Sequence, residues 1–196
     1  MKTANKAWTA LAGVFLILYS LPLALIFGGN TIRIISDGGW EMREFLSALF
    51  YLLFPVSGLF LILQKPKAAA VLMTVAALLA MISYLPTIPD YLRETIVEHG
   101  DHPTYIPRLY VLLPIVSCLV PTLFALALHL RGRVALILAL LAAVAEGAET
   151  VLIFGQAGYT MGHPTPLNVL MPFNFILAAI FAGIYRMSCG SLKESE

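Results

Sequence analysis

Two carboxylates stand inside an apolar stretch of this sequence. Glu146 and Glu149 are three positions apart, and residues 134–145 before them are all apolar. On a helix this spacing puts both side chains on one face. Such a pair can bind a proton or a cation, clamp a cationic or polyhydroxylated ligand, or hold helices together through hydrogen bonds.

A lipid environment makes these two groups costly. The apolar residues of the stretch favour membrane insertion by about 3–6 kcal/mol, and two carboxylates oppose it by about 5–7 kcal/mol. No Lys or Arg lies deep in any expected span to neutralise them. Because lipid favours the neutral form of a carboxyl group, we expect at least one glutamate to be protonated, or the pair to share a cation.

Hydroxyl and amide side chains of other spans are the available partners. We expect a ligand- or proton-binding site made of Glu146, Glu149 and Thr150 together with Ser83, Tyr84 and Asn174. Which partners face inward does not follow from the sequence. The wider set of candidates adds Tyr19, Ser20, Tyr51, Ser57, Ser117 and Thr122.

A second candidate site lies in a polar segment near the middle of the chain. His99, Asp101 and His102 are residue types that bind zinc. Their spacing matches no established metal motif, and the alternative is a solvated segment that binds nothing. No cofactor is expected.

The composition is that of a membrane protein. Of 196 residues, 60% are hydrophobic and 12% are charged, against about 25% charged in a soluble domain. The net charge is +1 and no basic patch is present, which excludes a nucleic-acid-binding protein. We predict a single all-α membrane domain over residues 1–196, with six transmembrane helices at about 7–28, 45–64, 68–88, 110–130, 134–155 and 169–187.

The distribution of basic residues predicts the orientation. Two short turns carry only positive charge, and the basic residues near both termini fall on the same side of a six-helix topology. The positive-inside rule places that side in the cytoplasm. We therefore expect both termini inside, in a bacterial or archaeal cytoplasmic membrane. These basic residues are Lys2, Lys6, Lys65, Lys67, Arg131, Arg133, Arg186 and Lys193.

Three outer loops are expected to connect the helices. Residues 30–44 should form a loop that turns at 37–39, and the Gly- and Pro-containing residues 156–166 an irregular one. In the longest loop, Pro89 suits a helix start, Leu92 and Ile96 lie one turn apart, and Gly100 suits a helix end. This pattern predicts a short amphipathic helix lying on the membrane surface.

A faint internal repeat relates the second and third helices to the fourth and fifth with an offset of 66 residues. Pro55 then aligns with Pro121, and the lysines of the first basic turn align with the arginines of the second. Either the hairpins are duplicated, as in some transporters, or the match is chance between Ala- and Leu-rich helices. Glu149 aligns with Ser83, so the carboxylates belong to one copy only.

Three classes of function are compatible with these features. The leading hypothesis is a multi-pass protein that binds or transports a small molecule or ion, with the bilayer as its environment. The second is a non-catalytic subunit or assembly factor that contacts a membrane-protein partner, with the glutamates only holding the bundle together. The third is a lipid-modifying enzyme with Glu146 as its general acid.

Overall fold

The structure is a computed structural model that describes residues 2–39, 42–92, 96–99, 102–105, 108–160 and 166–191. Six long helices make up most of it. They are α1 (Lys2–Ser36), α2 (Met42–Ile62), α3 (Pro66–Tyr84), α5 (Leu112–His129), α6 (Gly132–Thr160) and α7 (Pro166–Ser191). The smaller elements are η1 (Leu85–Thr87), α4 (Ile88–Leu92), β1 (Ile96–His99), β2 (His102–Tyr105) and η2 (Arg108–Val111).

All six long helices are long and apolar enough to cross a membrane. Their outward sides are covered with large aliphatic residues, as expected of surfaces that face lipid. The prediction of an all-α, six-span architecture is confirmed, and the chain is a multi-pass membrane protein. Prolines 22 and 55 lie inside α1 and α2 rather than at helix ends.

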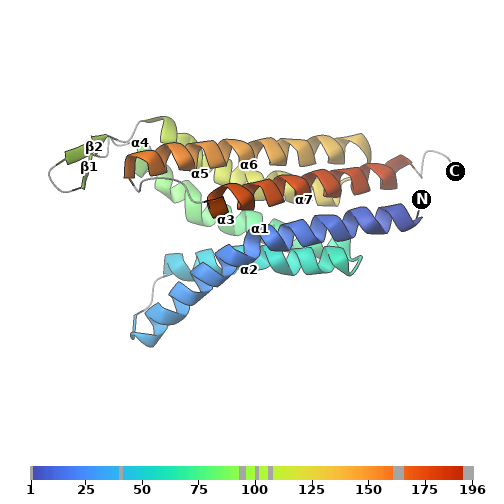
Figure 1. Ribbon diagram of the computed structural model, residues 1–196, viewed down its shortest axis with the longest axis horizontal. Helices are drawn as coiled ribbons and strands as arrows, with labels where there is room; N and C mark the ends of the chain where they lie inside the picture. Colours follow the sequence, from blue (N-terminus) through green and yellow to red (C-terminus); the bar gives the residue numbers. More distant parts are fainter. Residues whose placement is uncertain are drawn as a thin grey trace.

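The six helices form a closed ring in chain order. Each packs against the helix before and after it, and α7 closes the ring by packing against α1. Both ends of the chain lie at the same end of the bundle (Figure 1), as an even number of spans requires. At this end the side chain of Gln64, after α2, donates a hydrogen bond to the carbonyl of Lys6 on α1, at 3.1 Å. Which side of the membrane this end faces stays a prediction.

Small residues allow close approach between neighbouring helices. Gly13 of α1 and Gly58 of α2 meet backbone to backbone, because a Cβ on Gly58 would lie 2.6 Å from the carbonyl oxygen of Gly13. Beyond this contact, α1 and α2 turn away from the other helices at the end remote from the termini (Figure 1). Pro22 in α1 removes one backbone hydrogen bond, which is a common cause of such bending.

Two of the predicted loops are shorter than expected. Residues 30–36 continue α1, and residues 156–160 continue α6. The predicted boundaries were wrong because both relied on glycine or polar residues as helix ends. Glycine in a helix costs only about 1 kcal/mol, so the helix continues when nothing else stops it. The turn at Asp37 and Gly38 was placed correctly.

The predicted surface helix over residues 89–100 is also wrong in its second half. Helix α4 ends at Leu92, and Ile96 belongs to strand β1, which pairs with β2 in an antiparallel hairpin. Strand β1 begins with the β-branched pair Ile96-Val97, which favours extended backbone over helix. The apolar spacing that suggested a helix was too short to outweigh this preference.

Candidate functional site

Helix α6 positions both glutamates in the middle of the bundle. Glu146 is the central residue of this helix and only 4% exposed, and Glu149 is half-buried one turn further on. The longer α6 therefore places the pair nearer to the middle of the helix than the predicted span did. Two like charges about 5–6 Å apart repel by roughly 3 kcal/mol at an effective dielectric constant of about 20.

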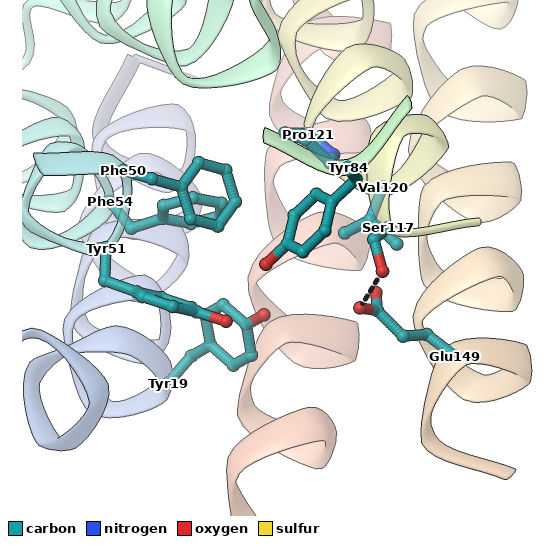
Figure 2. A pocket seen from close by; sticks show the side chains of 9 residues that line it. All are labelled: Tyr19, Phe50, Tyr51, Phe54, Tyr84, Ser117, Val120, Pro121 and Glu149. Carbon is teal, nitrogen blue, oxygen red and sulfur yellow. Dashed lines mark hydrogen bonds between the residues drawn. The ribbon is translucent and has the colours of Figure 1, made fainter. Parts of the chain in front are cut away.

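Glu149 is held by the neighbouring helix. The buried Ser117 of α5 donates a hydrogen bond from Oγ to Oε1 of Glu149, at 2.6 Å (Figure 2). This bond fixes the direction of the carboxyl group and connects α5 to α6. Because a serine hydroxyl can donate only once, its single proton is committed to Glu149.

Glu146 has a different environment. Tyr19 of α1 lies next to this carboxyl group. Its atom Oε2, by contrast, is buried and has no hydrogen-bond partner among the described residues. A buried polar atom without a partner is costly and therefore uncommon in proteins. The two carboxyl groups of the pair thus differ in their partners, although they share one helix face.

A small cavity lies beside Glu149. Its volume is about 10 Å³, which is room for about one water molecule. Three tyrosine hydroxyls point into the space between the aromatic rings and the Glu149 carboxyl group (Figure 2). The lining side chains come from five helices: Tyr19 of α1; Phe50, Tyr51 and Phe54 of α2; Tyr84 of α3; Ser117, Val120 and Pro121 of α5; and Glu149 of α6.

Packed aromatic rings hold the tyrosines in place. The ring of Tyr19 lies 5.7 Å from that of Phe54 and 5.1 Å from that of Phe175, between ring centroids. Tyr51 stacks on Phe27 at 4.7 Å. These spacings are those of favourable aromatic pairs, which restrict the rings more than aliphatic neighbours would.

Aromatic packing also connects the tyrosines of the cavity. The hydroxyls of Tyr51 and Tyr84 point into the same space (Figure 2). The ring of Phe50 packs edge-on against that of Tyr84, with centroids 6.3 Å apart. Tyr84 is the last residue of α3, so the aromatic cluster connects the end of α3 to α2.

The structure separates the predicted site residues. Tyr84 lines the cavity. Thr150 instead donates to the backbone carbonyl of Glu146, at 2.8 Å, and does not reach a carboxyl group. Ser83 has a buried hydroxyl without a hydrogen-bond partner among the described residues, and it does not line the cavity. Asn174 of α7 is half-buried and is likewise not part of the lining.

The wider set of hydroxyl candidates divides in the same way. Tyr19, Tyr51 and Ser117 line the cavity. The other three hydroxyls donate to the carbonyl group four residues earlier in their own helices, as serine and threonine often do in membrane helices. They are Ser20, Ser57 and Thr122.

The metal-site prediction falls mostly outside the described part of the chain. His99 and His102 are opposite each other in the hairpin register, but their side chains and the whole of Asp101 are outside the described residues. Among the residues that the structure describes, no group of three or more His, Cys, Asp or Glu side chains is close enough to hold a metal ion. A metal site on this hairpin stays a prediction.

One buried basic residue was not expected from the sequence. Arg186 of α7 is 6% exposed and donates to two backbone carbonyls at the end of α5, those of Leu130 at 2.6 Å and His129 at 2.9 Å. The guanidinium group therefore satisfies carbonyls that a helix end leaves free. It donates to the end of α5, about three helical turns beyond Ser117, the residue of that helix that contacts Glu149, so it does not neutralise the glutamates.

Comparisons with protein-family models, with curated proteins and with solved structures found no match.

Proposed function

We propose that this protein binds a proton or a single small inorganic cation at Glu146 and Glu149 and carries it across the membrane. The observation that supports this proposal is the combination of two interior carboxyl groups with a cavity of about 10 Å³. A cavity of this size accommodates a water-sized species. A vitamin- or sugar-sized ligand would require several hundred cubic ångströms.

The charge of the site favours a positively charged occupant. In the described part of the chain, every Lys and Arg lies near a helix end or between two helices. The glutamates therefore have no fixed countercharge, and a proton or cation is what would stabilise them in low dielectric. The hydroxyls of Tyr19, Tyr51 and Tyr84 can both donate and accept hydrogen bonds, which suits the relay of a proton.

Flux measurements in liposomes test the proposal. The purified protein is reconstituted with a pH-sensitive dye inside, and proton or alkali-cation movement is followed after an ion gradient is imposed. We expect flux from the wild type and a loss of at least tenfold in Glu149→Gln, which keeps shape and hydrogen bonding but removes the charge. Glu146→Gln and the double variant should also lose flux.

The matched control is Thr150→Val. It changes the next residue of α6 after Glu149, but the lost hydroxyl contacts only a backbone carbonyl. We expect this variant to keep wild-type flux. Folded Gln variants with wild-type flux would refute the proposal. Gln variants that fail to fold while a folded wild type carries no proton or cation would favour the packing role of the two glutamates instead.

A further inference from the structure

The cavity beside Glu149 presents oxygen atoms from five different side chains. Tyr19, Tyr51, Tyr84 and Ser117 contribute hydroxyls, and Glu149 contributes a carboxyl group. The other lining residues are apolar, so the lining side chains offer neither nitrogen nor sulfur ligands. Such an all-oxygen environment is the one that hard cations prefer, whereas zinc and copper sites use imidazole or thiolate.

Hydrogen bonding leaves these oxygens able to bind a cation. Ser117 donates its proton to Glu149. A hydroxyl that donates its proton keeps lone pairs for a second contact. The three phenol groups point toward the same space as the carboxyl group of Glu149 (Figure 2). Together, these side chains could surround a single ion that has lost its water shell.

The charge of the cavity wall limits the valence of the ion. Among the lining residues, only Glu149 has a side chain that can carry a full charge near neutral pH. Glu146 lies one helical turn away, next to Tyr19. The buried Oε2 of Glu146, without a hydrogen-bond partner among the described residues, is better tolerated on a neutral group than on a charged one. The charge of one ionised carboxylate is neutralised by one monovalent cation.

We infer that the cavity is a binding site for one dehydrated alkali-metal cation, held by Glu149, Ser117 and the three tyrosine hydroxyls, while Glu146 carries a proton. This inference rests on the proposed function and identifies its ion. A proton on Glu149 competes with the cation, so one alkali ion enters for each proton released. Both carboxyl groups are neutralised in either state.

Cation-dependent stability tests this assignment. The purified wild type is heated in buffers of constant ionic strength in which NaCl or KCl replaces N-methylglucamine chloride. We expect a saturable rise in the unfolding temperature with at least one alkali ion, and apparent affinity that weakens as the pH falls from 7.5 to 5.5. Binding of radioactive ²²Na⁺ or ⁸⁶Rb⁺ to the wild type measures the same site directly.

Several titratable groups surround the cavity in addition to Glu149. They are Glu146 on the same helix, the three tyrosines Tyr19, Tyr51 and Tyr84, and Cys118 of α5. The thiol of Cys118 is close enough to Glu149 to interact with its charge. Phenol and thiol groups ordinarily remain largely protonated below pH 7.5. The pH dependence should therefore come from the glutamates. It should disappear together with cation binding in Glu149→Gln.

Matched variants locate the effect. We expect Tyr84→Phe and Tyr51→Phe to weaken the apparent affinity about tenfold, because each removes one oxygen ligand. Tyr185→Phe makes the same change at the far end of α7, outside the cavity lining, and should leave the affinity unchanged.

The results separate this inference from the proposed function. Wild-type protein that conducts protons through Glu149 but neither binds nor responds to alkali ions would overturn the cation site and leave the proposed function intact. Stabilisation by Mg²⁺ or Ca²⁺ at lower concentrations than by Na⁺ or K⁺ would overturn the monovalent assignment. Equal weakening in Tyr185→Phe and Tyr84→Phe would overturn the ligand set.

Discussion

The contact between α1 and α2 predicts a large effect from a very small substitution. A Cβ added to Gly58 would lie 2.6 Å from the carbonyl oxygen of Gly13, and one added to Gly13 would overlap the carbonyl oxygen of Gly58. Both obstacles are backbone atoms, which cannot rotate away as a side chain can. Gly13→Ala or Gly58→Ala must therefore push the helices apart, and overpacking of this kind costs about 1–3 kcal/mol.

A Gly→Ala substitution elsewhere in α1 should have the opposite effect on stability. A Cβ on Gly28 would meet nothing within 4 Å. Alanine is favoured over glycine inside a helix by about 0.5–1 kcal/mol, so Gly28→Ala should stabilise the protein. The two variants should therefore differ by roughly 1.5–4 kcal/mol, the sum of the two effects.

Thermal unfolding of the purified variants in detergent measures this difference. For a chain of this size, each kcal/mol shifts the unfolding temperature by about 2–4 °C, so Gly13→Ala and Gly28→Ala should differ by roughly 3–16 °C. Gly58→Ala should behave like Gly13→Ala, because the contact is reciprocal. Equal unfolding temperatures for Gly13→Ala and Gly28→Ala would refute the close approach of α1 and α2.

Two further predictions concern polar contacts between helices. Ser117→Ala should lower the free energy of unfolding by about 1–3 kcal/mol, since it removes the donor to Glu149. Ser57→Ala should lower it by less than about 1 kcal/mol, because the Ser57 hydroxyl bonds only within α2. Similar losses for the two variants in chemical denaturation would contradict a stabilising hydrogen bond between Ser117 and Glu149. Arg186→Met should destabilise the protein by about 2–4 kcal/mol, because it leaves two carbonyls of α5 unpaired. Arg186→Lys should recover only part of this loss, since an ammonium group lacks the planar fork, and full recovery in thermal unfolding would mean that charge alone matters.

The number and type of the helices could be predicted from the sequence because lipid imposes one strong rule. Backbone polar groups must be satisfied within each span, so an apolar run of about 20 residues has to be a helix. The helix ends were harder to predict. At residues 30–36 and 156–160 the chain remains helical beyond the membrane-length stretch, where hydropathy no longer decides the structure.

The hairpin formed by β1 and β2 shows a related difficulty. Leu92 and Ile96 have a helical spacing, but two apolar residues are a weak pattern outside the membrane. The local preference of Ile96 and Val97 for extended backbone, and pairing with residues 104 and 105, determine the structure there. Pairing between segments cannot be seen in the spacing of one of them.

The glutamate pair could be identified from the sequence because its cost is local. Two carboxyl groups in an apolar helix are unusual whatever surrounds them. Their partners depend instead on how each helix is rotated in the ring, which composition does not reveal. Ser117 and Thr122 are both hydroxyl residues of α5, yet only Ser117 faces Glu149, whereas Thr122 donates to its own helix.

The proposed internal repeat aligns residues that line the same cavity. With the offset of 66 residues, Tyr51 aligns with Ser117 and Phe54 with Val120, and all four line the same space. Helices α3 and α6 begin at aligned positions, Pro66 and Gly132. Duplication stays a prediction, but it would explain why two hairpins of like orientation contribute matching positions to one cavity.

The hairpin of α2 and α3 differs from that of α5 and α6 at the position of Glu149. At the position of Glu149, the first hairpin has Ser83, whose hydroxyl is buried and lacks a hydrogen-bond partner among the described residues. A second carboxylate there would add a negative charge next in sequence to Tyr84, which lines a cavity large enough for about one water molecule or ion. One monovalent ion could not neutralise both groups. A single copy of the glutamate pair is therefore what a site for one proton or one alkali cation requires.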